Sequence, residues 1–476
     1  MLFIKITLLL LIHLFNFSFE NLYNYSKNAS NLSSYNLYKK SQKNILLPLQ
    51  YEENENYFLV AIGIGEPINY YPLQIDIKLD QTWIPSIKCS NCKSLTKYNL
   101  SDSNCSRTTN ENFSIYNFEG IVNGKIGYDK LSLNNIEITN FKFIECLNLI
   151  DNNNIHQDGK LGLGYYNNNN ENVSSFNLLE KLYQDGIIDR RVFALKEINN
   201  VDGELILGDI FSEMRYKNFP LFNITRKNYV NNNNKIINYN NDSWTIELNY
   251  ILLDGNYSNK SDEFNIFKNP IKINKNATFD STYSYIDIPI EFIDKIKKDL
   301  LDKYFGNIFN LSKDNNGNYY FSTNIVLYNN IDFKKLKNIN FSFIFDHFSY
   351  GILLKDLFEQ KNSDTVEFKI RFKKDNVINL GYLFIKQFII VFDKDYEVIG
   401  IDGDYVDLFN AIEYYNSNKI ILFIKKHWKI ICGILGGLLL LILIFLLYRL
   451  IRKNSNDSNE KLSLIKNENK DKELIY

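Results

Sequence analysis

Asp158-Gly-Lys-Leu-Gly-Leu-Gly164 begins the stretch of sequence that decides the fold, and it is an apolar run punctuated by glycine. After it, the residues from Phe176 to Tyr183 place apolar side chains three and four positions apart, which predicts a helix. A second short apolar run, Val192-Phe-Ala-Leu195, follows. Short apolar runs broken by glycine, with one brief helix between them, indicate a mainly β protein.

The chain on both sides of this stretch has the same texture. From Leu46 onward, short runs rich in Ile, Val, Tyr and Phe alternate with Gly and Asn-Asn turns, which predicts many strands. A second helix is expected from Ile290 to Tyr304. The Asn-rich stretch 231–241 reads as a surface loop, and it divides an N-terminal lobe (46–230) from a C-terminal lobe (242–410).

Composition and charge limit the fold and the partners that the protein can have. The chain has 476 residues, of which 45% are hydrophobic and 23% are charged, so it can bury large cores. Lys and Arg number 54 and Asp and Glu number 55, and the charges are spread along the chain. Nucleic acid is therefore excluded as a partner, because no basic region is available to bind phosphates.

Four blocks in order resemble the pepsin-like aspartic proteases. Beside the stretch quoted first, they are Tyr57-Phe-Leu-Val-Ala-Ile-Gly-Ile-Gly65 with Ile75-Asp-Ile-Lys-Leu-Asp-Gln-Thr-Trp83-Ile-Pro-Ser86, then Ala277-Thr-Phe-Asp280-Ser-Thr-Tyr-Ser284, then Asn379-Leu-Gly381 through Ile401. The resemblance covers roughly residues 46–403 and implies a mainly all-β, bilobal pepsin-like fold with few short helices. The pair Cys89-Ser-Asn-Cys92 and Cys105 soon after the first of these blocks, together with an apolar C-terminal segment at 430–448, are similar in layout to the membrane-anchored plasmepsins.

The resemblance implies that Asp76 and Asp280 are the catalytic pair. In this family two carboxylates, one from each lobe, share a proton and activate one water molecule, and the mechanism needs no metal or other cofactor. The expected ligand is a peptide or protein substrate in the cleft between the lobes.

Both active-site loops depart from the family pattern Asp-Thr/Ser-Gly-Ser/Thr. They read Asp76-Ile-Lys-Leu79 and Asp280-Ser-Thr-Tyr283, so Lys78 and Thr282 replace the family glycines. In the family, a hydroxyl side chain next to each aspartate joins one loop to the other, and here Ser281 is the only one that remains. An ammonium from Lys78 near Asp76 would favour two ionised carboxylates; the alternative is that Lys78 extends to solvent.

Substrate-binding residues are also carried over from the family. The flap hairpin aligns its tyrosine position with Asn117, next to Tyr116 and close to Gly120, and Tyr116 replaces that tyrosine only if the hairpin contains a bulge. Trp83 is retained, either to reach the flap or for ordinary packing. With Ser281, these residues form the predicted substrate-binding set.

The cysteines predict disulfides in an oxidising compartment. Cys89, Cys92, Cys105 and Cys146 precede the C-terminal apolar run, which itself contains Cys432, and their even number favours two bridges with three pairings left open. A zinc site at Cys89-Ser-Asn-Cys92 is the alternative, and it is disfavoured because no second CxxC or nearby His completes it. Sequons at Asn99, Asn223 and Asn310 permit glycosylation.

Two apolar segments predict a single-pass type I membrane protein of the secretory pathway, at the endoplasmic reticulum, an endosomal or lysosome-like organelle, or the cell surface. The predicted segments are a signal peptide (1–20), a polar segment or pro-segment (21–45), a juxtamembrane segment (411–429), a transmembrane helix (430–448) and a cytosolic tail (449–476). In the tail, Glu460-Lys-Leu-Ser-Leu-Ile465 fits an acidic dileucine signal, which would bind a sorting adaptor.

Two functions from different classes follow. The first is a membrane-anchored aspartic endopeptidase of the secretory or endosomal system, and retention of both aspartates favours it. The alternative is a catalytically impaired pseudopeptidase that binds peptides or partner proteins in its cleft, and the altered loops favour this. A rigid spacer in an adhesion protein is a third, weaker idea.

Overall fold

The structure is a computed structural model that describes residues 44–52, 57–117, 120–151, 158–165, 176–199, 202–208, 210, 219–225, 244–255, 270–314, 317–331, 339–407, 444–447 and 449. The predicted signal peptide, the Asn-rich loop 231–241, the juxtamembrane segment and the dileucine signal lie outside these residues. Of the predicted span 430–448, only 444–447 are described, as helix. No helix in the described ranges is long and apolar enough to cross a membrane.

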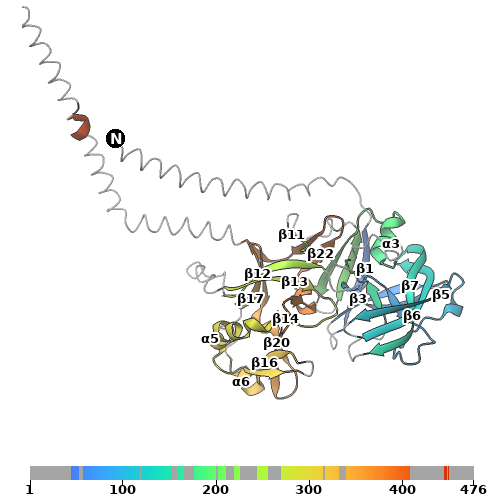
Figure 1. The fold of residues 1–476 in the computed structure, drawn as a ribbon, viewed down its shortest axis with the longest axis horizontal. Helices are drawn as coiled ribbons and strands as arrows, with labels where there is room; N and C mark the ends of the chain where they lie inside the picture. Colours follow the sequence, from blue (N-terminus) through green and yellow to red (C-terminus); the bar gives the residue numbers. More distant parts are fainter. Residues whose placement is uncertain are drawn as a thin grey trace, which may run out of the picture. The chain divides into compact units, whose positions relative to one another are not determined.

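The chain divides into a compact unit that ends at Val406 and a second unit from Asp407 onward. The strands of the described residues all begin within the first unit, and they form two large sheets, as the mainly β prediction requires (Figure 1). The helices in the same part of the chain are few and short.

The first sheet has 13 strands, most of them from the first half of the chain. Their order is β11 (Leu221–Asn223), β23 (Val398–Asp402), β22 (Ile389–Asp393), β9 (Val192–Asn199), β10 (Asp202–Gly208), β1 (Asn44–Glu52), β2 (Tyr57–Ile64), β3 (Asn69–Asp76), β8 (Lys160–Gly162), β4 (Trp83–Pro85), β7 (Ile136–Asp151), β6 (Gly120–Leu133) and β5 (Arg107–Asn117). Because β22 pairs with β9, strands from the end of the C-terminal half join the sheet of the N-terminal half.

The second sheet contains 11 strands from the C-terminal half, drawn from yellow-green to orange in Figure 1. Its order is β15 (Asn310–Lys313), β16 (Tyr319–Asn324), β20 (Thr365–Lys373), β14 (Ile286–Pro289), β21 (Ile378–Leu380), β13 (Ile271–Phe279), β12 (Thr245–Gly255), β17 (Ile339–Phe345), β18 (Phe348–Leu353) and β24 (Tyr405–Asp407), with β19 (Phe358–Gln360) beside β20.

Both predicted helices are present. Helix α3 (Leu178–Gln184) begins after Asn177, whose side-chain oxygen accepts hydrogen bonds from the backbone N–H groups of Leu179 and Glu180. The second region is helical from Ile290 to Phe305 and includes a π-helical part at Ile296–Leu301. Two further short helices, α6 (Ile325–Asn329) and α8 (Tyr382–Ile385), follow the strands β16 and β21.

The two halves repeat one arrangement around the aspartates. Strand β3 ends at Asp76 and pairs in parallel with β8, and β13 ends just before Asp280 and pairs in parallel with β21. Each short strand also pairs antiparallel with the next strand after the aspartate, β4 in the first half and β14 in the second. The chain thus builds two equivalent aspartate loops, each supported by a short strand.

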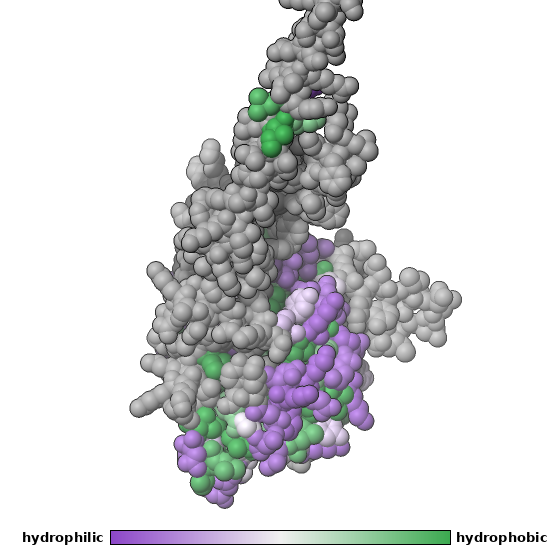
Figure 2. Space-filling model, turned by 90° about the vertical axis from the view of Figure 1, so that its left-hand side faces the viewer, coloured by the Kyte–Doolittle hydropathy of each residue, from purple (hydrophilic) through white to green (hydrophobic). Residues whose placement is uncertain are grey.

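One large apolar core spans both sheets, so the strands that carry the loops are buried. Ile75, just before the first aspartate, and Phe279, just before the second, are both fully buried. On the face shown in Figure 2, hydrophilic residues are interspersed with smaller groups of hydrophobic ones. The loops are therefore fixed from beneath by close packing of the core.

Candidate active site

Asp76 is held by the backbone of its own loop. Its Oδ1 accepts hydrogen bonds from the N–H of Lys78 and the N–H of Leu79, each at 2.9 Å. The residue is 4% exposed. Charge-assisted bonds from backbone N–H groups stabilise the ionised carboxylate and fix its orientation.

Asp280 is held in the equivalent way. Its Oδ1 accepts from the N–H of Thr282 at 3.0 Å and from the Thr282 hydroxyl at 2.8 Å. Its Oδ2 accepts from the Asn379 amide at 3.2 Å, and the residue is completely buried. Both aspartates therefore keep the backbone donor two residues ahead.

These donors persist although both family glycines are replaced. In the described part of the chain, non-glycine residues with a left-handed φ are Asn134, Asn140, Asn274, Asp346 and Glu397, so neither Lys78 nor Thr282 has one. Loss of glycine therefore does not remove the backbone support of the carboxylates.

Ser281 joins the two loops. Its hydroxyl donates to the carbonyl of Ile75 at 2.7 Å and accepts from the N–H of Ile77 at 3.2 Å. The position equivalent to Ser281 in the first loop is Ile77, which is buried and offers no hydroxyl. A side-chain hydroxyl of the second loop therefore holds the first loop, but no equivalent hydroxyl of the first loop holds the second.

The Lys78 side chain neither pairs with Asp76 nor extends fully into solvent, which were the two expectations from the sequence. Its ammonium lies 2.5 Å from Oδ2 of Asp280, the aspartate of the opposite lobe, while its own N–H donates to Asp76. The side chain is 28% exposed. One residue of the first loop thus contacts both aspartates, and it introduces a positive charge at the centre.

Lys160 is a site residue that the sequence analysis missed. Its Nζ lies 3.0 Å from Oδ2 of Asp76, and its side chain is only 1% exposed. By strand register, Lys160 in β8 and Asn379 in β21 each pair with the residue two positions before their aspartate, so they occupy equivalent positions. The available signal was a lysine inside an otherwise apolar, glycine-punctuated run.

Each aspartate therefore has its own ammonium partner. Burial raises the pKa of Asp280, but the Lys78 ammonium and the Thr282 hydrogen bonds outweigh burial and lower it to about 2. A carboxyl with this pKa is ionised at mildly acidic pH. Lys78 and Lys160 thus add two ammonium groups to a centre that in the family contains two aspartates sharing one proton.

Tyr116 of the predicted flap does not pack around Trp83. Tyr116 is 61% exposed, whereas its neighbour Ile115 is buried in the same cluster as Trp83. From Asn112 to Asn117 the hairpin pairs in unbroken register down to Gly120, so no bulge turns Tyr116 inward. Trp83 is fully buried, and its Nε1 has no hydrogen-bond partner among the described residues.

The cysteines correct the expectation of two disulfides. Cys89 and Cys92 are bridged, but Cys105 is free and exposed and Cys146 is free and buried. The Cys105 thiol donates to the Glu66 carboxylate, while Cys146 lies beside the bridge, so the two free thiols have different environments. In the described residues, the sulfurs of Cys89, Cys92 and Cys146 lie within 4.8 Å of one another, but the first two are joined in the disulfide and are not free to bind a metal.

Comparison with known proteins agrees with this geometry. The family model of eukaryotic aspartyl proteases matches residues 56–402. Gastricsin of Cavia porcellus is 23% identical over 204 residues (41% of this chain, 48% of the relative), and pepsin A of Bos taurus is 28% identical over 173 residues (35% and 45%). Pepsin-3 of Oryctolagus cuniculus is 35% identical over 95 residues (19% and 24%). The matches span from about a quarter to about half of the length of these relatives.

Proposed function

The chain belongs to the eukaryotic aspartyl protease family, and from that premise we propose that it binds an extended peptide or protein segment in the cleft between its lobes without cleaving it. The family fold provides the cleft, and pairing with an exposed backbone binds an extended chain through main-chain hydrogen bonds. Lys78 and Lys160 suppress the hydrolysis that the family otherwise performs.

The observation that carries this proposal is the pairing of each aspartate with a lysine. Hydrolysis requires one carboxylate to accept a proton from water while the other carboxyl donates a proton to the carbonyl oxygen. The Lys78 ammonium, 2.5 Å from Asp280, keeps that carboxyl ionised, so it has no proton to donate. The Lys160 ammonium, 3.0 Å from Asp76, stabilises the second carboxylate.

The second candidate is the endopeptidase, which hydrolyses peptide bonds with Asp76 and Asp280. The retained backbone donors and the Ser281 lock favour it, because they keep both carboxylates oriented. Lys78 is also 28% exposed on a flexible stem, so substrate could displace its ammonium. Lys160 is 1% exposed and has no such freedom. This difference favours binding over cleavage.

The test compares cleavage of an unfolded protein substrate by the full chain from acidic to neutral pH, with pepstatin as inhibitor. We expect no turnover but retained binding of the inhibitor. Replacing both lysines (Lys78→Gly with Lys160→Ile) should produce turnover that Asp76→Ala or Asp280→Ala abolishes, while Lys130→Met, at a surface ion pair, should produce none. Wild-type turnover that both aspartate variants abolish would establish the endopeptidase instead.

We also propose that the protein works as a single-pass type I membrane protein of the secretory or endosomal system. The signal-like segment 1–20, the apolar segment 430–448 and the adaptor motif ending at Ile465 support this by sequence alone. Glycosylation fits the sequons, and Asn223 and Asn310 are exposed. Carbonate extraction of membranes and glycosidase treatment test the proposal; release of the chain by carbonate would contradict the anchor.

A further inference from the structure

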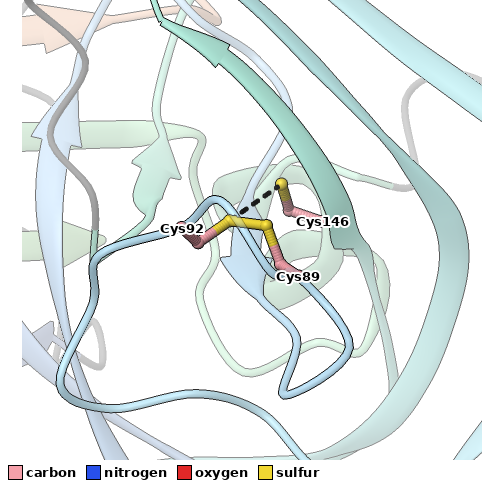
Figure 3. A group of neighbouring side chains, drawn as sticks. All are labelled: Cys89, Cys92 and Cys146. Atoms are coloured by element: carbon pink, nitrogen blue, oxygen red, sulfur yellow. Dashed lines mark hydrogen bonds between the residues drawn. A yellow bond between two sulfur atoms is a disulfide. The ribbon is translucent and has the colours of Figure 1, made fainter.

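Three cysteine sulfurs lie together in a buried cluster that also contains Leu79 of the first aspartate loop. Cys89 and Cys92 form a disulfide in the loop after β4, and the Sγ of Cys146 in β7 lies 3.8 Å from the Sγ of Cys92. Figure 3 shows the Cys146 side chain directed from its strand at the Cys92 end of the bridge. The free thiol is thus in van der Waals contact with one defined sulfur of the disulfide.

From this contact we propose that Cys146 and the Cys89–Cys92 bridge form a thiol–disulfide exchange site, which gives the protein two alternative disulfides. The Cys146 thiolate attacks Sγ of Cys92, the Cys92–Cys146 bond forms and the Cys89–Cys92 bond breaks. Cys89 leaves as a thiolate and takes up the proton that Cys146 released. One disulfide and one thiol are present before and after, so no outside oxidant or reductant is needed.

The loop is already attached to β7 where the new bond would form. Asn91, between the two bridged cysteines, donates from its amide to the Leu149 carbonyl and to the Asn148 side chain, and it accepts from the Leu149 N–H. Strand β4, which precedes this loop, is also paired with β7, and Pro85 lies opposite Cys146 in that pairing. The Cys92–Cys146 bond therefore requires a local shift of the loop and no rearrangement of the sheet.

The two bridges constrain the chain differently. Cys89 and Cys92 are three residues apart, whereas Cys92 and Cys146 are separated by 54. In the chain-entropy model a longer closed loop restricts the unfolded chain more, so the exchanged bridge is the more stabilising constraint. The three cysteines also share one buried cluster with Leu79, whose N–H holds Asp76. Exchange would therefore alter the packing around Leu79 of the first aspartate loop.

Burial controls the rate of exchange. It raises the pKa of the Cys146 thiol to about 12, so the attacking thiolate is scarce at neutral pH. The rate should rise about tenfold for each pH unit up to that pKa, because the thiolate is the nucleophile.

Mapping of free thiols in the full chain tests the site. The protein is held at pH 7 or pH 9, quenched with acid, alkylated in denaturant and digested without reduction, and the labelled peptides are identified by mass spectrometry. We expect label to move from Cys146 to Cys89 with time, about a hundredfold faster at pH 9 than at pH 7, while a peptide joined through Cys92 and Cys146 accumulates. Label confined to Cys146 after long incubation at pH 9 would overturn the proposal.

Variants identify the nucleophile. Cys105 is exposed and free, so its label provides an internal standard in the wild type, and Cys105→Ser should leave the movement of label unchanged. Loss of the movement in Cys105→Ser would transfer the role to that thiol and overturn the assignment to Cys146. Cys146→Ser should leave Cys89 unlabelled at all times; if this variant does not fold, the wild-type and Cys105→Ser maps still decide. The proposal does not depend on whether the aspartates hydrolyse peptides.

Discussion

Replacing Lys160 with Met should destabilise the fold by about 3 kcal/mol at pH 7. The Lys160 side chain is 1% exposed, and its ammonium lies 3.0 Å from an Asp76 carboxylate that is 6% exposed. Met fills a similar volume but carries no charge. The substitution therefore leaves the Asp76 carboxylate buried without its counter-ion and changes the packing little.

The magnitude follows from the geometry. Opposite unit charges 3.0 Å apart attract by about 5–6 kcal/mol at an effective dielectric constant near 20. Removing one partner of a buried pair typically costs about 3–5 kcal/mol. Asp76 keeps its two backbone donors, from Lys78 and Leu79, which stabilise the remaining charge. The loss should therefore fall in the lower half of that range.

Urea unfolding of the full chain measures the loss. Adding Asp76→Asn to Lys160→Met removes the stranded charge, and this double variant should regain about 2 kcal/mol of the loss. The matched control is Lys130→Met, because Lys130 pairs with Glu137 at the surface and its removal should cost much less than the removal of Lys160. A loss in Lys160→Met no greater than that of the control would refute the buried ion pair.

Two further predictions concern the same centre. Ser281→Ala removes the hydroxyl that joins the loops and should lower the free energy of unfolding by about 1–3 kcal/mol. The control Ser90→Ala, at an exposed position, should change it by less than about 0.5 kcal/mol. Equal effects of the two substitutions would mean that the Ser281 hydroxyl does not stabilise the fold. The pKa of Asp280 is lowered from 3.8 to about 2, so its ionised form stabilises the fold above pH 3.8, and about 2 kcal/mol of stability is lost as pH falls toward 2. Lys78→Met should remove most of this loss, and parallel stability curves for variant and wild type between pH 5 and 2 would contradict the assignment.

The two aspartates were placed by the resemblance of the blocks around them to the pepsin-like aspartic proteases, and the structure holds them in equivalent loops. The strand-rich fold and both helices were predictable because strand and helix periodicity are local properties of sequence. The role of Lys160 was not, because it depends on the parallel pairing of β8 with β3, which joins residues far apart in the chain. A lysine in an apolar run gives no indication of which carboxylate it will meet.

The ion-pair partner of Lys78 could not be predicted from the sequence for a different reason. Its sequence neighbour is Asp76, so proximity along the chain suggested that pair, but the backbone N–H already satisfies Asp76 and the flexible side chain extends to Asp280. The cysteines behave similarly, because parity favoured two bridges whereas the fold places Cys146 beside an existing bridge and leaves Cys105 at the surface. In both cases the three-dimensional neighbour, and not the spacing, determines the partner.

The two lysines make physical sense as a set. An ammonium at one aspartate alone would leave the other carboxylate buried with backbone and amide donors but no counter-charge. Here Lys78 extends from the first lobe to Asp280, and the buried Lys160 lies 3.0 Å from Asp76, so each aspartate has a lysine beside it. The Lys78–Asp280 pair joins the two loops, in addition to the hydroxyl of Ser281. Lys78→Gly alone should raise the pKa of Asp280 but leave Asp76 paired with Lys160. We therefore expect turnover only when both lysines are replaced.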